Sequence, residues 1–400
     1  MTAEMNTPER HVLVDTDTGV DDALAILTAL NAPDTSVIGI GTVFGNCTEH
    51  QAAQNVLTVL AAVNRTDIPV CVGSPRPGPA PTTPSPHGSD GLGGRGLQPP
   101  PSVRLSDETA VDQILRTGRE RPGQVDLLCL APLTNIAAAI TRDPTILRQF
   151  RSVTIMGGMG TADRREIVAA AQPKFLAKGD TNTNHDPAAA ATVAATPGPV
   201  TWVGMDVTGR LRLRWADLQT LTSTSNIARF IQTITEDYHV YCTNTYGAEQ
   251  PIYTAHDSVA TSVMLDPTVI LSSVSATAQV HSADGRSALW GTTLTIGPQC
   301  TRWQPTSTTP RSETESPAPS QVRESIERNA QFFERRWWQH VSNGIQTQSA
   351  ESARQPDLAR SLGQPETGRT DRTRSRTPDS ALPSATTRDG RQSMRPVGQL

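Results

Sequence analysis

The chain has 400 residues and a formal net charge of −4 at pH 7, which argues against a nucleic acid or an anionic membrane as its main partner. Its length is enough for a large buried core, and no apolar run is long enough to span a bilayer. The five cysteines are scattered and the first residues lack the layout of a signal peptide, so we expect a cytoplasmic protein with reduced thiols.

The stretch His11–Ile26, HVLVDTDTGVDDALAI, carries the strongest signal in the sequence. The apolar run Val12–Val14 predicts a strand, Gly19 predicts a tight turn, and the Ala/Leu-rich residues after it predict a helix. Four aspartates follow the strand: Asp15, Asp17, Asp21 and Asp22. Open α/β sheets bind ligands at this edge, so the pattern predicts a site there.

Carboxylates packed this closely raise one another's pKa unless a cation lies among them. The set contains only oxygen ligands, which favours Ca²⁺ or Mg²⁺ over zinc. Acids at a helix start also suit the helix dipole whatever the function, which accounts for Asp21 and Asp22 but not for Asp15 and Asp17.

Asp-Thr-Asp-Thr-Gly-Val-Asp-Asp-Ala resembles the N-terminal signature of the nucleoside hydrolases, Asp-x-Asp-x-Gly-x-Asp-Asp-Ala. A haloacid dehalogenase-type phosphatase with Asp15 as nucleophile is an alternative, although that family expects Thr or Val at Gly19. We expect an α/β fold: an open, mostly parallel Rossmann-like sheet flanked by helices, with a C-terminal hairpin and helix. The resemblance implies hydrolysis of the N-glycosidic bond of ribonucleosides.

Buried strands and helices alternate along the chain, as in a parallel sheet covered by helices. The expected strands are Ser36–Phe44, Ile68–Val72, Val125–Leu130, Ser152–Met156 and Val200–Val203. The expected helices are Gln51–Val63, Asp107–Thr117, Ile136–Ile140, one from Ala188, Trp215–Leu221 and Asn226–Tyr241. We expect Gly118 to end the helix before it.

The long loop 74–105 is rich in proline and glycine, so it cannot form regular structure. Its segment His87-Gly88-Ser89-Asp90-Gly91 resembles the His-Gly-x-x-Gly that nucleoside hydrolases place beside the substrate. We therefore treat the loop as an active-site loop, with a plain surface linker as the alternative.

Three later segments match the resembled family. Leu130 occupies the position whose backbone carbonyl binds the metal, and Met156, at the next strand end, is a substrate-side candidate. Asp180 and Asn182 match a Glu-x-Asn that holds ribose hydroxyls, although Asp180 is one methylene shorter than glutamate. Asp186 is expected to cap a helix with Pro187 at its first position.

His256 and Asp257 match a His-Asp pair in which the Asp closes the metal site and the His reaches the nucleobase. The resemblance thus implies a Ca²⁺ ion held by Asp17, Asp22, the Leu130 carbonyl and Asp257. Calcium accepts six to eight oxygens, which leaves room for a ribose diol and a water.

In this hypothesis Asp17 activates the water, and Asp21 and Asn46 bind ribose hydroxyls. His256 and His87 would serve the departing base. The absence of a phosphate-cradling Gly-Lys-Ser/Thr loop favours a small ribonucleoside over a nucleotide. An inactive ribose- or calcium-binding homologue remains a further alternative.

The domain organisation follows from composition. We expect a flexible N-terminus (1–10), a catalytic domain (11–300) that ends in a hairpin at Ala276–Ile296 with its turn at Asp284-Gly285, a linker (301–320), an amphipathic helix (321–342) and a disordered tail (343–400). The chain is expected to form a dimer or tetramer of identical subunits.

Overall fold

The computed structural model describes residues 10–78, 85–161, 179–209, 212–221, 226–274, 278–283, 286–290 and 293–296. The expected linker, closing helix and tail lie outside these ranges, and the domain boundaries, the oligomer and the cytoplasmic location stay predictions. None of the described helices is both long and apolar enough to cross a membrane.

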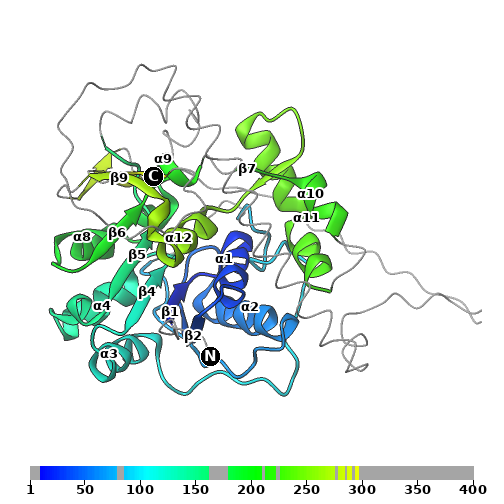
Figure 1. The fold of residues 1–400 in the computed structure, drawn as a ribbon. Helices are drawn as coiled ribbons and strands as arrows, with labels where there is room; N and C mark the ends of the chain where they lie inside the picture. Colours follow the sequence, from blue (N-terminus) through cyan, green and yellow to red (C-terminus); the bar gives the residue numbers. More distant parts are fainter. Residues whose placement is uncertain are drawn as a thin grey trace, which may run out of the picture. The chain divides into compact units, whose positions relative to one another are not determined.

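Six parallel strands form the central sheet of the described residues, in the order β3-β2-β1-β4-β5-β6 (Figure 1). They are β1 (Arg10–Thr16), β2 (Thr35–Thr42), β3 (Val70–Cys71), β4 (Val125–Cys129), β5 (Ser152–Met156) and β6 (Val200–Val203). The predicted α/β fold with a parallel sheet is confirmed. The strand order reverses between β1 and β4, and ligands of open α/β sheets bind at the carboxyl ends beside such a reversal.

Helices cover both faces of this sheet. They are α1 (Val20–Leu30), α2 (Glu49–Ala62), α3 (Ala110–Glu120), α4 (Thr134–Arg142), α7 (Thr181–His185), α8 (Pro187–Ala195), α9 (Met205–Thr208), α10 (Trp215–Leu221), α11 (Asn226–Tyr246) and α12 (His256–Leu265), with short 3₁₀ turns at Ile146–Gln149 and Pro267–Val269. As predicted, the Asp186 side chain caps α8, accepting from Ala189 N at 3.0 Å, with Pro187 as its first residue.

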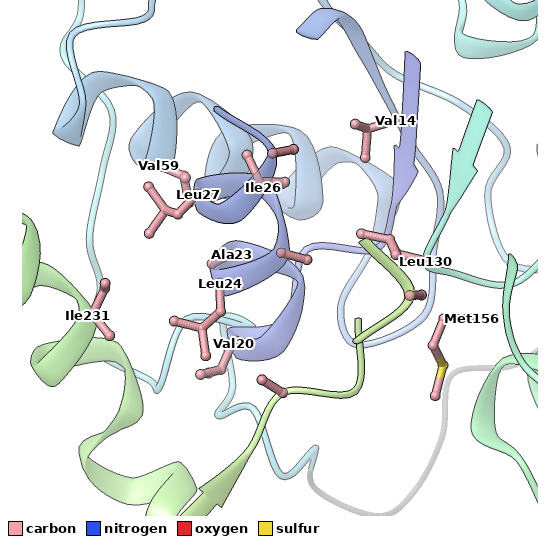
Figure 2. Packing of buried hydrophobic residues seen from close by; sticks show 14 of the residues in the cluster. Val14, Val20, Ala23, Leu24, Ile26, Leu27, Val59, Leu130, Met156 and Ile231 are labelled. Atoms are coloured by element: carbon pink, nitrogen blue, oxygen red, sulfur yellow. The ribbon is translucent and has the colours of Figure 1, made fainter. Parts of the chain in front are cut away.

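The alternation of side chains along the strands divides the core in two. Val12 and Val14 of β1 face the layer of α1, α2 and α12, whereas Leu13 between them faces α3, α4 and α8. Helix α1 is buried from Val20 to Ala29, and beyond the two aspartates of its first turn it is almost entirely apolar. Figure 2 shows its side chains packed between those of α2 and α11.

Short antiparallel pairs complete the described fold. Strand β10 (Gln279–Ala283) pairs with β11 (Arg286–Trp290), which confirms the predicted hairpin up to Trp290 but not to Ile296; its turn lies outside the described residues. Strand β9 (Ile270–Val274) pairs with β12 (Thr293–Ile296), and β7 (Arg212–Arg214) pairs with β8 (Ile252–Thr254).

The prediction that Gly118 ends a helix is wrong. Helix α3 continues to Glu120, and Gly118 is buried within it. A Cβ atom at this position would lie 2.8 Å from Ile146 Cδ1 and 3.3 Å from Gln149 Cβ. Glycine is therefore used here to let the 3₁₀ turn Ile146–Gln149 approach the helix closely.

Two valines that differ in burial provide a test of how the core is packed. Val59 of α2 is 0% exposed, whereas Val240 of α11 is 49% exposed. We expect Val59→Ala to lower the free energy of unfolding by roughly 1.5 to 3 kcal/mol, because it removes buried methyl groups and leaves a cavity. We expect Val240→Ala to change it by less than about 0.5 kcal/mol. Urea unfolding at constant m-value measures both, and equal losses would contradict the packing described.

Candidate functional site

The candidate site is built where α1 and α12 begin side by side at the carboxyl edge of the sheet. Their first turns carry Asp21 and Asp22 on α1 and Asp257 on α12. One carboxylate oxygen from each of these three buried residues lies within 4.8 Å of the others. Two helix N-termini, each the positive end of a dipole, thus meet at one cluster of acids.

Asp17 adjoins this cluster through Asn46. The Asn46 backbone N donates to Asp17 Oδ2 at 2.8 Å, and its Nδ2 lies 3.2 Å from both Asp17 Oδ1 and Asp22 Oδ2. Asp22 is held further by Thr16 Oγ1 at 2.5 Å and by Gly19 N at 2.9 Å. One amide therefore ties Asp17, on the turn after β1, to Asp22 on α1.

Burial raises the pKa of all four carboxyl groups, because the charged form loses its hydration. The neighbouring charge of Asp22 raises the pKa of Asp17 and Asp21 further, and that of Asp257 is raised by Asp21, Asp22 and Asp17. No arginine of the described chain forms an ion pair with these aspartates; His87 Nδ1, 3.7 Å from Asp21 Oδ1, is the nearest basic atom. The ligand atoms that these aspartates offer are all oxygens, and together they carry an excess of negative charge, which suits a hard divalent cation.

The ends of β4 and β5 lie next to this cluster. Leu130 N donates to the Asp15 carbonyl at 2.9 Å, so the end of β4 adjoins that of β1. Asn182 Nδ2 donates to the carbonyls of Leu130 at 2.9 Å and Met156 at 3.1 Å, joining β4 to β5. The structure thus brings the predicted residues Leu130, Met156 and Asn182 together.

Asp180 is placed differently from its neighbours. Its side chain is buried and caps α7, with Oδ1 accepting from Thr183 N at 2.9 Å. Its Oδ2 accepts from Leu289 N at 3.5 Å. Both carboxylate oxygens are therefore already bonded to the protein backbone.

His87 lies between the acids and helix α11. Its Nδ1 accepts from Val20 N at 3.1 Å, so the neutral ring carries its proton on Nε2. The ring stacks on Tyr238 with centroids 4.9 Å apart. Burial lowers the pKa of His87 to about 3, so the ring is an uncharged hydrogen-bond donor near neutral pH.

His256 is buried beside the same helix. Its Nδ1 lies 3.0 Å from Thr208 Oγ1, and its Nε2 lies 3.2 Å from the Tyr246 hydroxyl. Burial lowers its pKa to about 4, so this histidine is also neutral near pH 7. The sequence reasoning missed Tyr238 and Tyr246. Their spacing with Cys242, every fourth residue on one helix face, was the available signal.

Asp15 stands apart from the other acids. Its Oδ1 accepts from Asn135 Nδ2 of α4 at 2.7 Å, on the opposite face of the sheet from α1. Burial raises its pKa to about 7. This position gives no support to a phosphatase that uses Asp15 as nucleophile.

The sequence of this chain is similar to those of known nucleoside hydrolases. A family model described as inosine-uridine preferring nucleoside hydrolase matches residues 12–333. Uridine nucleosidase 1 of Arabidopsis thaliana is 33% identical over 267 residues, which cover 64% of this chain and 74% of the plant protein. Probable uridine nucleosidase 2 of Oryza sativa subsp. japonica is 30% identical over 263 residues, 65% of this chain and 75% of the relative.

Solved structures of nucleoside hydrolases have a similar fold. A plant nucleoside hydrolase aligns with a TM-score of 0.61 and 27% identity, covering 72% of this chain and 87% of that one. A purine-preferring ribonucleoside hydrolase from Gardnerella vaginalis aligns with a TM-score of 0.63 over 81% of this chain and 99% of its own. At 23% identity, this second likeness concerns the fold alone.

The raised pKa values predict how stability depends on pH. A carboxyl group whose folded pKa lies above its unfolded value stabilises the fold at low pH, and this contribution is lost as the pH rises through the folded pKa. We therefore expect metal-free Asp257→Asn to be more stable than the unchanged chain at about pH 8, by roughly 1 kcal/mol or more, and similar to it at about pH 4. Thermal unfolding of chelated protein at both values measures this.

The same variant should respond less to calcium. A cation bound at a hundred times its Kd stabilises a fold by about 2.7 kcal/mol, and the loss of one ligand reduces that gain. Asp34→Asn, at an exposed position, is the matched control and should behave as the unchanged chain. An equal calcium response in Asp257→Asn would contradict a shared cation site.

Proposed function

We propose that this chain, which belongs to the inosine-uridine preferring nucleoside hydrolase family, hydrolyses ribonucleosides to free nucleobase and ribose. In this proposal Asp17 is the general base. The observation that carries the proposal is the meeting of Asp21, Asp22 and Asp257 beside Asp17. The relatives named uridine nucleosidases make uridine the first substrate to test.

The acids fit Ca²⁺ as the metal, with Asp17, Asp22, Asp257 and the Leu130 carbonyl as the proposed ligands. When bound, the cation supplies positive charge that offsets the carboxylate repulsion, orients a ribose diol and makes a nearby water more acidic. We assign Asp21 and Asn46 to the ribose hydroxyls. Asp21 is the member of the acid cluster that lies 3.7 Å from His87 Nδ1, and Asn46 contacts both Asp17 and Asp22.

Asp17 removes a proton from the attacking water. Its burial makes the carboxylate more basic than an exposed aspartate, which suits this role. As the bond to the base breaks, positive charge develops on the sugar ring, and the surrounding carboxylates stabilise it. Asn182 is proposed to complete the sugar side, since it lies at the ends of β4 and β5. Asp180 is proposed there as well, although its oxygens also bind backbone amides.

The departing base needs a hydrogen bond or a proton. His87 offers its Nε2–H, because its Nδ1 is occupied by Val20 N. His256 is joined to the Tyr246 hydroxyl, so these two groups form a second donor site beside α11. Both histidines are neutral near pH 7, and we propose that they bind the base by hydrogen bonds rather than by charge.

Purified protein incubated with uridine and with inosine tests the proposal. We expect ribose release that stops on chelation and returns with calcium. Asp17→Asn should lower kcat by roughly 10² to 10⁴, the usual contribution of a general base. Asp34→Asn is the control. The proposal fails if no common nucleoside is cleaved in the presence of calcium, and ribose binding without turnover would favour an inactive homologue.

A further inference from the structure

A single buried amide connects the two loops of the site. Asn55 lies on α2 and is 1% exposed. Its Nδ2 donates to the Thr18 carbonyl at 3.1 Å, in the turn that carries the acids, and to the Asp90 carbonyl at 2.7 Å, in the loop that carries His87. An amide NH₂ has two hydrogens, and both are used here to join segments far apart in the sequence.

The turn at Thr18 is strained. Thr18 has φ +36°, a conformation that β-branched residues rarely adopt, and it is fully buried between Asp17 and Gly19. Strained backbone of this kind persists only where the surroundings hold it, and it is concentrated at functional sites. The Thr18 N–H bonds Thr16 Oγ1 at 3.0 Å and its carbonyl bonds Asn55, so both sides of the strained residue are fixed.

The loop on the other side is shaped by Asp90. Its carboxylate accepts three backbone N–H groups, each at 2.8 Å, from Leu92, Gly94 and Gly96. Gly93 N also donates to the His87 carbonyl at 2.8 Å, which closes the loop on the histidine. A Cβ at Gly93 would lie 2.6 Å from the Ile234 carbonyl, so the loop rests directly on the backbone of α11.

The orientation of the Asn55 amide is itself controlled. Gln51, one turn earlier on α2, donates its Nε2 to Asn55 Oδ1 at 3.0 Å. This bond keeps the oxygen of Asn55 away from the two carbonyls and its NH₂ toward them. Gln51 is half-buried, so it can be changed with less risk to the fold than Asn55.

We infer that Asn55 is a positioning residue that fixes His87, on the base side, relative to the acids on the sugar side. The inference rests on the proposed function. The acid turn keeps further side-chain bonds among Thr16, Asp22 and Asn46. The loop of His87 is tied to α2 through Asn55, and without that bond the ring keeps its contacts with Val20 N and Tyr238 while the backbone of the loop loses its link to α2. Loss of the amide should therefore displace the histidine more than the acids.

Leaving-group dependence tests this role. Uridine needs its departing base to be hydrogen-bonded, whereas a nitrophenyl riboside releases a stable anion without such help. We expect Asn55→Ala to lower kcat on uridine by roughly 10- to 100-fold, since displacements near 1 Å have such effects, and to change kcat on the nitrophenyl riboside by less than about threefold. Equal losses on the two substrates, or no loss on either, would overturn the inference.

A second pair of variants covers the case in which Asn55→Ala does not fold. Gln51→Glu replaces the donor that faces Asn55 Oδ1 by an acceptor, which favours the reversed amide. It should give the same selective loss on uridine. Gln54→Glu makes the same chemical change on α2 at a half-buried position outside this set of bonds, and it should match the unchanged chain.

Alkylation of Cys47 tests the contact between Asn55 and the loop of His87 without a measurement of catalysis. Its Sγ lies 3.8 Å from Asn55 Nδ2, and a Cβ at Gly91 of the loop would approach it to 3.2 Å. We expect iodoacetamide to label Cys47 at least several-fold faster in Asn55→Ala and Gln51→Glu, with buried Cys242 unchanged. Unchanged labelling overturns the inference. Absence of ribose release by the unchanged chain would count against the proposed function alone.

Discussion

The repulsion among buried carboxylates governs this structure. Asp17, Asp21, Asp22 and Asp257 lie out of water, and no arginine of the described chain forms an ion pair with them. Among the described residues, backbone amides, the Thr16 hydroxyl and the Asn46 side chain bond these acids, two helix N-termini meet at them, and Arg76 interacts electrostatically with Asp17. Each of these lowers the cost of burial, yet the pKa of every member stays raised. A site so arranged gains most from a ligand of opposite charge, and the sugar-binding and water-activating roles proposed here depend on that gain.

The fold creates this concentration of charge by topology. The parallel sheet reverses its order between β1 and β4, so the acid turn after β1 lies beside the ends of β4 and β5, whose carbonyls accept from Asn182. Helix α12 packs against α1 on one face of the sheet and brings Asp257 to the same point. The neutral histidines and the tyrosines of α11 lie on the other side of the acids. The arrangement separates a charged side, which we propose binds the sugar, from an uncharged side, which we propose binds the base.

The sequence predicted those parts whose geometry is local or matches a family motif. Strand, turn and helix at Val12–Ile26 follow from apolar pattern and one glycine, and His256-Asp257 followed from resemblance. The role of Asn55 could not be predicted, because its partners Thr18 and Asp90 meet only in the folded chain. Gly118 was misinterpreted because close packing and helix termination both select glycine. The contacts of Asp180 with Thr183 and Leu289 could not be predicted either, because they depend on neighbours that meet only in the folded chain.

The position of Asp257 on α12 also bears on how the chain reaches its native state. Asp17, Asp21 and Asp22 leave the ribosome early, whereas Asp257 emerges only after the six strands of the sheet have been synthesised. Bringing α12 onto α1 closes a very long loop, a late event on entropic grounds. The cluster of three acids is therefore complete only when α12 docks on α1, and the repulsion between Asp257 and the acids of α1 arises at that step.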